Sequence, residues 1–282
     1  MKHDAPILFE GLHSCYFLTD VRIKNRMKIY RESNIEHQYY WYLFESEKNV
    51  FKKIFFLSEY FKLISFEKTV KFSDLMLVVS EADKKYLQEK FPKNKIIYLP
   101  SFHGNEKITS KTGKGNYVLY HGNLSVPENE KAAIYLMKNI FSNSSIPFKI
   151  AGLHPSERLK KIISVNKNIE LIENPNDIKM QDLIANAHIH LLITFQATGL
   201  KLKLLNTLYN GRFCLVNTPM LNGTNLENLC VVADSVTEMK AAINKLFEIE
   251  FTASEIEKRK AVLENNFSDT ANAQKISDLV FG

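Results

Sequence analysis

Two lysines lie close together at the start of a predicted helix, in the stretch ATGLKLKLLNTLYNGRFCLVN (residues 197–217). Gly199 precedes Lys201 and Lys203, and an apolar helical run, Gly211 and a short strand-like run follow. A positive charge near a helix N-terminus is unfavourable because it opposes the helix macrodipole. An anion in front of the helix would remove that conflict, and a phosphate group is the usual anion there. The stretch therefore predicts a phosphate site.

Glycines end two other predicted strands in the same part of the chain, at Gly122 and Gly152. The carboxyl ends of parallel strands share one edge of a sheet, and ligands bind outside that edge. Although a single glycine after a strand is more often a turn, three of them beside two lysines predict a diphosphate site. The sequence contains neither G-x-x-x-x-G-K-[ST] nor G-x-G-x-x-G, which argues against a P-loop or a dinucleotide-binding Rossmann site.

Short apolar strands alternate with helices from residue 108 onward, which predicts a doubly wound α/β domain over residues 108–267. The predicted strands are 116–122, 147–152, 168–173, 188–195, 212–217 and 229–234. The predicted helices are 127–141, 155–165, 179–187, the apolar run after Gly199, and 236–250.

Residues 1–107 also show an α/β pattern, but with fewer strands. The predicted strands are 5–13, 27–33, 73–80 and 94–100, with one or two long helices over 34–72 and a helix over 81–91. The stretch 103–116 is polar and rich in Gly, Lys, Ser and Thr, which predicts a linker. We therefore expect domains at 1–107 and 108–267, followed by a C-terminal helix within 268–282.

Composition narrows the functional classes. The 282 residues are 45% hydrophobic and 24% charged, which is typical of a soluble globular protein. The net charge of +6 suits an anionic small molecule, an anionic membrane surface or nucleic acid. Because no dense Lys/Arg tract occurs, nucleic acid is the least favoured of the three. The sequence has neither a signal-peptide pattern nor a long apolar span, so we expect a cytoplasmic protein.

Cysteine and histidine spacing does not indicate a metal site. Cys15, Cys214 and Cys230 are far apart and form no C-x-x-C motif. His188 and His190 alternate along a predicted strand and could share one face, but a third ligand is not evident. We expect both histidines to be structural and no metal to be bound.

Aromatic residues are concentrated in the first part of the chain, where residues 1–107 hold 20 of the 32. A helix pair packed on a small sheet would account for this concentration. The alternative is a surface that meets a membrane or another polypeptide, because large apolar patches rarely remain exposed. The lysine- and phenylalanine-rich run 49–68 could lie on an anionic bilayer.

Several of these segments resemble GT-B glycosyltransferases, and most closely the retaining enzymes of glycosyltransferase family 4. YVLYHGNLSVPENEKAAIYL, FKIAGLHPS, LIANAHIHLLI and TGLKLKLLNTLYNGRFCLVN resemble the nucleotide-sugar-binding half. NIEHQYY, FEKTVKFSDLMLVVSEADKKYL and IIYLPSF resemble the acceptor half. The resemblance implies two Rossmann-like doubly wound domains. Because residues 5–13 resemble only about the fourth strand of the acceptor domain, it also implies an incomplete N-terminal domain, with a partner chain as one source of the rest.

The resemblance implies which residues bind the donor. Gly122, Asn123, Lys201 and Lys203 would face the diphosphate. Asn206 and Thr198 occupy positions where the family usually carries two carboxylates, and an amide lacks the charge that strengthens hydrogen bonds to ribose hydroxyls. The donor-binding candidates are His121, Gly122, Asn123, Gly152, Thr198, Gly199, Lys201, Lys203 and Asn206.

The resemblance also implies a catalytic histidine. His13, at the end of the strand predicted over 5–13, occupies a position where family members often place a histidine close to the transferred sugar. Glu10 is the second catalytic candidate, although three residues along one strand would place it on the opposite face. A loop histidine without a role is the alternative for His13, and a strand-end cap is the alternative for His121.

The implied activity is retaining transfer of a hexose, such as mannose, from a nucleotide-sugar to a glycan or lipid-linked acceptor in cell-envelope polysaccharide synthesis. The implied reaction releases a nucleoside diphosphate and needs no cofactor or obligatory metal. The protein would be cytoplasmic or peripheral at the inner face of the membrane. A truncated, non-catalytic homologue that binds nucleotide or a partner subunit is the alternative, and an unrelated nucleotide-binding α/β protein is a third.

Overall fold

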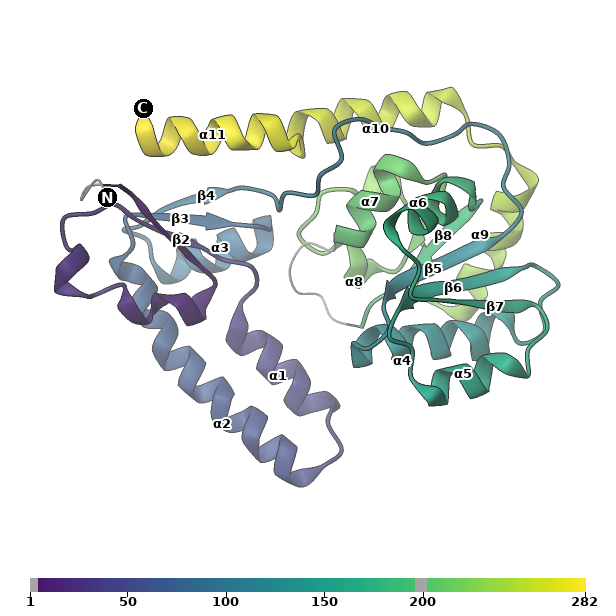
Figure 1. The fold of residues 1–282 in the computed structure, drawn as a ribbon, viewed down its shortest axis with the longest axis horizontal. Coiled ribbons are helices and arrows are strands. Elements are labelled where there is room, and N and C mark those ends of the chain that lie inside the picture. Colours follow the sequence, from purple (N-terminus) through teal and green to yellow (C-terminus); the bar gives the residue numbers. More distant parts are fainter. Residues whose placement is uncertain (1–4, 196–201) are drawn as a thin grey trace. The chain divides into compact units, whose positions relative to one another are not determined.

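The computed structural model describes residues 5–195 and 202–282, which form two compact units (Figure 1). Among these residues, the first unit contains 5–101 and 270–282, and the second contains 102–195 and 202–269. The division falls at 101/102, within a few residues of the predicted 107/108. The segment predicted as a separate C-terminal helix belongs to the first unit.

The described part of the first unit contains a four-stranded parallel sheet in the order β1-β2-β3-β4. Its strands are β1 (Ile7–Glu10), β2 (Lys28–Arg31), β3 (Leu75–Val78) and β4 (Lys95–Tyr98). Its helices are α1 (Glu36–Ser46), α2 (Val50–Glu67), α3 (Glu81–Lys90) and α11 (Asp269–Phe281), with 3-10 turns at Leu12–Phe17, Val21–Ile23 and Lys68–Phe72. The predicted run 34–72 is therefore a helical hairpin.

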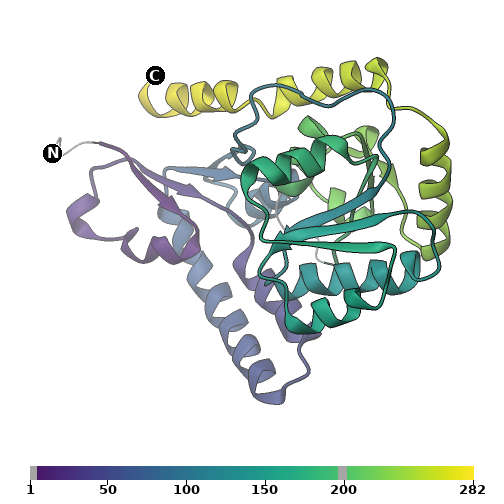
Figure 2. The ribbon, with the colours of Figure 1, turned by 45° about the vertical axis from the view of Figure 1, so that its right-hand side comes forward.

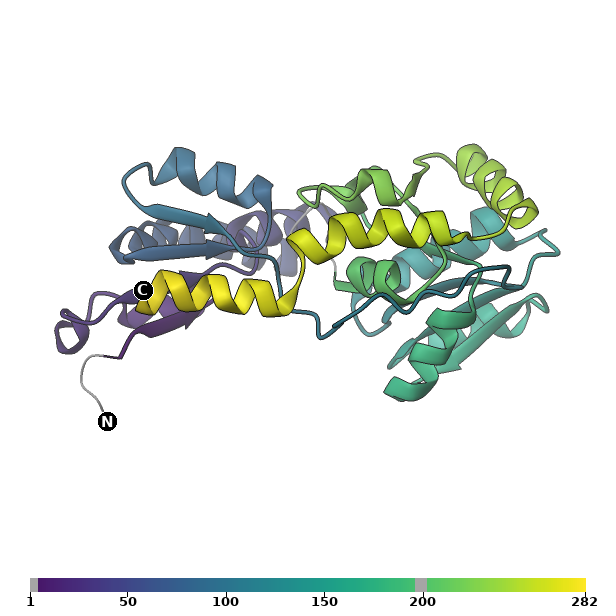
Figure 3. The ribbon, with the colours of Figure 1, turned by 90° about the horizontal axis from the view of Figure 1, so that it is seen from above.

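Both faces of this sheet are covered. One face packs against α2 and α3, where Met76, Val78 and Leu87 belong to one buried cluster. The other face packs against α11, which Figure 3 shows as the yellow helix beside the sheet. Leu75 and Leu77 of β3 meet Ile276 and Val280 there. All four residues of β3 are buried, as expected for a strand covered on both sides.

The strand predicted over 5–13 is shorter in the structure. It ends at Glu10, and Gly11 then turns the chain with a φ of 73°, a left-handed conformation that favours glycine. A 3-10 turn over Leu12–Phe17 follows. His13 therefore lies in this turn, and the prediction that it stands at the end of a strand is wrong by three residues.

The described part of the second unit contains a six-stranded parallel sheet in the order β10-β9-β8-β5-β6-β7. Its strands are β5 (Val118–Asn123), β6 (Phe148–Leu153), β7 (Ile169–Glu173), β8 (Ile189–Leu192), β9 (Phe213–Val216) and β10 (Val231–Val232). Along the chain, β6 and β7 are added in turn on one side of β5, and β8 is then added on the other side of β5. This reversal between β5 and β8 is the topological switch point of the sheet.

Helices cover both faces of the second sheet (Figure 2). α4 (Pro127–Leu136), α5 (Glu157–Ser164) and α9 (Val236–Glu248) contribute to the larger core, whereas α6 (Asp177–Asn186) contributes to a smaller core that includes Tyr117 and Leu119. In Figure 1, α6 and α7 (Leu202–Asn210) lie on the side of the sheet opposite α4 and α5. Each predicted strand and helix from 116 to 248 has a counterpart, and the fold class is confirmed. The helices α8 (Thr218–Leu221) and α10 (Ala253–Asn266) were not predicted.

We predict that Gly152→Ala destabilises the second unit. Gly152 lies opposite Gly122 in the β5–β6 register, and a Cβ atom at residue 152 would overlap the Gly122 carbonyl oxygen. Overpacking of this kind costs about 1–3 kcal/mol, measurable by urea unfolding. Gly122→Ala is the matched control, because its Cβ would meet Asn129 Cγ at 3.4 Å. Equal losses from both substitutions would contradict the steric explanation.

Candidate functional site

The candidate donor site lies at the switch point between β5 and β8. β5 ends at His121, Gly122 and Asn123, which are followed by the N-terminus of α4. Ligands of doubly wound sheets bind outside the carboxyl edge at such a reversal, because the two flanking loops diverge to opposite faces. Of the described candidates that the sequence analysis placed after separate strands, the fold brings Lys203 of α7 close to Asn123 at the end of β5, through Asn129.

Lys203 places a positive charge at this edge. Its Nζ donates to Asn129 Oδ1 at 3.1 Å and lies 5.3 Å from the centroid of the Tyr120 ring. Asn129 Nδ2 in turn donates to the Asn123 carbonyl at 2.9 Å. Lys203 is half-buried in the first turn of α7. The lysine is thus held against the end of β5, where a partly screened cation can attract a phosphate.

A carboxylate that the sequence analysis did not single out joins the two sides of the switch point. Glu128, in the first turn of α4, accepts hydrogen bonds from the Thr194 hydroxyl and from the Phe195 N–H, the latter at 3.1 Å. Thr194 follows β8 and is also held by Asn217, whose Nδ2 donates to the Thr194 carbonyl at 2.7 Å. An acidic residue at position N2 of a helix can be recognised from the sequence. The sequence does not show that Thr194 and Phe195 are the hydrogen-bond partners of this residue.

The remaining donor candidates occupy different settings. His121 is buried, with Nε2 3.1 Å from Thr207 Oγ1. Asn206 lies in α7 and its Oδ1 accepts from Asn210 Nδ2 at 2.8 Å. The need for a glycine at residue 152 is explained by the close approach of its backbone to Gly122, which leaves no space for a side chain. Thr198, Gly199 and Lys201 lie outside the described residues.

The two alternating histidines, His188 just before β8 and His190 within it, are both buried. His188 Nε2 lies 2.8 Å from the Leu246 carbonyl and His190 Nε2 lies 3.1 Å from the Ile184 carbonyl. The His190 ring fills the space where a side chain at Gly211 would lie, which explains the second glycine of the lysine-containing stretch. Within residues 5–195 and 202–282, no group of three or more His, Cys, Asp or Glu side chains is arranged to hold a metal ion.

The carboxyl edge of the first sheet pairs His13 with a carboxylate other than Glu10. His13 Nε2 lies 3.9 Å from Glu36 Oε2 at the start of α1, and the side-chain exposures are 70% and 13%. Burial raises the pKa of Glu36, and the nearby His13 opposes that rise. Glu10 instead pairs with Arg31 at 3.4 Å. The structure therefore associates the candidate catalytic histidine with Glu36.

One further carboxyl group lies at the carboxyl edge of the first sheet. Glu32, directly after β2, is fully buried, and burial raises its pKa well above the usual range. Its Oε2 accepts the Val79 N–H at 3.5 Å, and among the described residues Oε1 has no hydrogen-bond partner. The carboxyl edge of the first sheet thus carries carboxyl groups and His13, whereas the edge of the second sheet carries Lys203.

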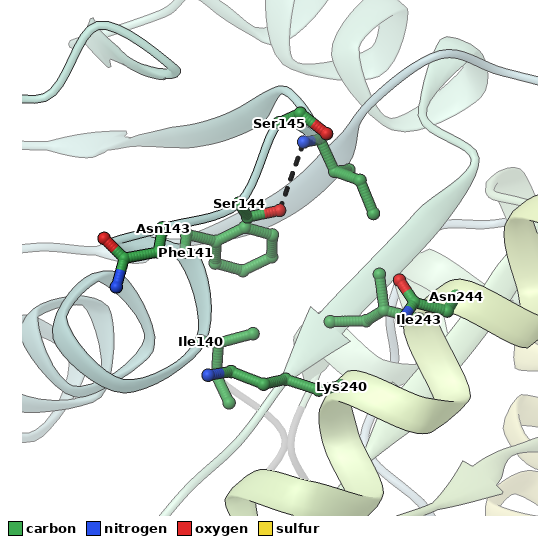
Figure 4. A pocket seen from close by; sticks show the side chains of 9 residues that line it. Ile140, Phe141, Asn143, Ser144, Ser145, Lys240, Ile243 and Asn244 are labelled. Carbon is green, nitrogen blue, oxygen red and sulfur yellow. Dashed lines mark hydrogen bonds between the residues drawn. The ribbon is translucent and has the colours of Figure 1, made fainter.

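A separate hollow of about 330 Å³ lies at the opposite end of the second unit (Figure 4). It lies between α9 and the segment that precedes β6, and Lys240 supplies its charged group. Ser144 Oγ accepts the Ile146 N–H at 3.1 Å on its rim. Since this hollow is at the amino ends of the strands, we do not assign the donor to it.

Comparisons with known proteins place this architecture among the GT-B glycosyltransferases. TarM superposes with a TM-score of 0.71 at 11% identity, over 98% of this chain and 54% of TarM. An alpha,alpha-trehalose-phosphate synthase (UDP-forming) from Burkholderia vietnamiensis superposes with a TM-score of 0.71 at 9% identity, over 99% and 75% of the two chains. A chain of the GtfA/B complex gives 0.60 at 13% identity, over 92% and 54%. The chain therefore has the GT-B fold.

A sequence relative comes from Klebsiella pneumoniae and is named an uncharacterised 44.6 kDa protein in the cps region. The two sequences are 30% identical over 263 residues, which is 86% of this chain and 65% of the relative. The chain thus spans slightly less than two thirds of that relative's length. No family model matches the chain.

We predict that acid destabilises the second unit partly through His121. Burial, and secondarily Lys203, lowers the pKa of His121 to about 3, whereas an unfolded histidine titrates near pH 6.5. The unfolded state therefore binds a proton that the folded state excludes, and stability is lost as pH falls from about 6.5 toward 3. Between pH 7.5 and 5.0, His121 should account for about 2 kcal/mol of lost unfolding free energy.

Urea unfolding of a His121→Gln variant at both pH values measures this contribution. The variant should show a smaller loss between pH 7.5 and 5.0 than the original chain. His154→Gln, at an exposed position of the same unit, is the control and should retain the full loss. An unchanged pH dependence in His121→Gln would refute the assignment.

We also predict that His13→Ala raises the pKa of Glu36, because protonated His13 stabilises the Glu36 carboxylate. Carboxyl ¹³C chemical shifts followed during a pH titration measure the change. Glu10→Gln should leave the Glu36 titration unchanged, since Glu10 pairs with Arg31. A change in the Glu36 pKa caused by Glu10→Gln but not by His13→Ala would contradict the assignment of His13 as the partner of Glu36.

Proposed function

We propose that this chain is a glycosyltransferase that moves a hexose from a nucleotide-sugar to a glycan or lipid-linked acceptor. The observation that carries the proposal is Lys203 at the switch point of a GT-B fold, where it is held by Asn129 of α4 beside the end of β5. Lys203, together with Lys201, would bind the donor diphosphate, with Gly122 and Asn123 beside it. Retaining chemistry, the family 4 assignment and a mannose donor remain proposals from the sequence resemblance.

In the proposed reaction, the acceptor hydroxyl oxygen forms a bond to the anomeric carbon of the sugar. The bond between that carbon and the diphosphate oxygen breaks, the nucleoside diphosphate leaves with the electron pair, and the proton of the acceptor hydroxyl passes to the leaving phosphate oxygen. The lysines stabilise the negative charge that develops on the leaving group. His13, oriented by Glu36, is proposed to act on the acceptor side. We propose that no obligatory metal or other cofactor takes part.

The relative in a cps region supports a place in polysaccharide synthesis. A polysaccharide synthesis region needs transferases that extend a growing glycan, and the GT-B fold is compatible with this role. Specific contacts in the site determine which sugar and which nucleotide are used. Fold similarity does not identify either of them.

A second candidate function is a non-catalytic subunit that binds nucleotide and a partner polypeptide. Asn206 and Thr198 replace the two family carboxylates, and the Asn206 amide oxygen already accepts from Asn210. Within the described residues, β1 is the edge of its sheet, and its Leu8 is 54% exposed beside an apolar cavity of about 190 Å³ under α11. An open parallel edge with apolar surface can pair with another strand.

We predict that Lys203→Ala abolishes nucleoside diphosphate binding. A ligand that binds only the folded state raises the melting temperature, so the wild-type chain should be stabilised by one member of a panel of UDP, GDP, ADP, CMP and dTDP. The variant should lose that stabilisation. Lys167→Ala, an exposed lysine at the amino end of β7, is the control and should retain it. Undiminished stabilisation of Lys203→Ala would place the donor elsewhere.

We predict that His13→Ala retains nucleotide binding but loses sugar release from the matching nucleotide-sugar. Release of nucleoside diphosphate from the donor, with and without acceptor glycans, measures this activity. A wild-type chain that binds nucleotide and releases no diphosphate under any of these conditions would favour the non-catalytic subunit. Full activity in His13→Ala would remove the histidine from the proposed mechanism.

A further inference from the structure

The outer face of α2 is apolar along most of its length although no described element of the first unit covers it. Five large side chains on this face are between 54% and 84% exposed; they are Val50, Phe51, Ile54, Phe55 and Phe61. The first four are related by steps of three or four residues, and Phe61 follows Ile54 by seven, which places all five on one side of the helix. Three helical turns separate the first from the last, a length of about 16 Å.

The inner face of α2 is already occupied. Phe56 contacts Tyr40 and Tyr60 contacts Trp41 of α1, with ring centroids 6.2 Å and 5.1 Å apart. Leu63 is buried in the core of the first unit. Packing within the unit therefore explains one side of the helix and leaves the other side unexplained. Exposed apolar patches of this kind mark interaction surfaces.

Positive charge surrounds the exposed face. Residues 48–71 contain six lysines and two glutamates. One glutamate, Glu67, is buried and paired with Lys90, and the other, Glu59, pairs with Lys62 at 2.7 Å. Lys48 and Lys52 are exposed beside Phe51 and Val50 at the start of the helix. At the preceding turn, Glu47 accepts the Lys48 and Asn49 N–H groups, which ties its carboxylate to the backbone.

We propose that the outer face of α2 docks on an anionic lipid bilayer. Phe51, Ile54 and Phe55 would enter the boundary between headgroups and acyl chains, while the lysines contact anionic headgroups. α2 would lie in the interface: the structure contains, within its described residues, no helix long and apolar enough to cross a bilayer. This surface is distinct from the nucleotide site, and the proposal does not depend on the proposed catalytic function.

Vesicle flotation tests the proposal. The chain should float with vesicles of equal parts phosphatidylcholine and phosphatidylglycerol, and much less with phosphatidylcholine alone. Phe51→Ser with Phe55→Ser should weaken the partition at least ~10-fold, because each change removes an aromatic ring that would be buried in the bilayer. Lys48→Ala with Lys52→Ala should weaken it about fivefold per lysine, and added salt should act in the same direction.

A control variant removes two exposed apolar side chains from the second unit. Val165→Ser with Ile178→Ser changes two residues of the second unit that are each 79% exposed, and should leave flotation unchanged. Melting temperatures of all variants verify that the fold is intact.

Three outcomes would overturn the proposal. The first is an absence of flotation with either vesicle type, and the second is equal flotation with both. The third is a dimer in light scattering that Phe51→Ser with Phe55→Ser dissociates, with no vesicle binding, since a second copy of the chain would then cover this face.

Discussion

The position of Lys203 depends on how the C-terminal end of its helix is anchored. Arg259 of α10 is buried and donates to the carbonyls of Leu208, Gly211 and Arg212 at the end of α7. Burial lowers the pKa of Arg259 to about 10, so the guanidinium stays charged at neutral pH. Carbonyls at a helix C-terminus carry partial negative charge and need donors. One cation therefore satisfies the end of α7 and fixes the helix whose first turn presents the lysine.

A second arginine has the same role for α6. Arg212 donates to the carbonyls of Ala185 and Ala187, where α6 ends. His190 then fills the space beside Gly211, directly before this arginine. Hydrogen bonds from both guanidinium groups to backbone carbonyls offset part of the cost of burying these charges. Among the described residues, Arg212 Nε and His190 Nδ1 have no hydrogen-bond partner.

The two sheets differ in the chemistry of their carboxyl edges. The first has His13 with Glu36 and the buried Glu32, whereas the second has Lys203 and the hydrogen-bonded Glu128. Transfer of a sugar from a diphosphate needs a cation for the leaving group and a group that interacts with the acceptor hydroxyl. Each of these requirements has a counterpart on one of the sheets. The outer face of α2 is a third kind of surface, because it is apolar. None of the residues named at the two carboxyl edges belongs to this helix.

The sequence by itself determined the alternation of strands and helices. Short apolar runs, two of them ending in glycine, are each followed by a helical pattern, and few folds other than a parallel α/β sheet accommodate this alternation. It also indicated Lys203, through the conflict between a cation and a helix N-terminus. It could not identify Glu36 as the partner of His13, since that contact depends on where the 3-10 turn after Gly11 directs the histidine. Nor could it assign α10, whose polar sequence has weak amphipathic patterning. Only the tertiary structure decided which of the many apolar side chains in residues 34–72 are buried, because local periodicity does not show which face of α2 meets α1.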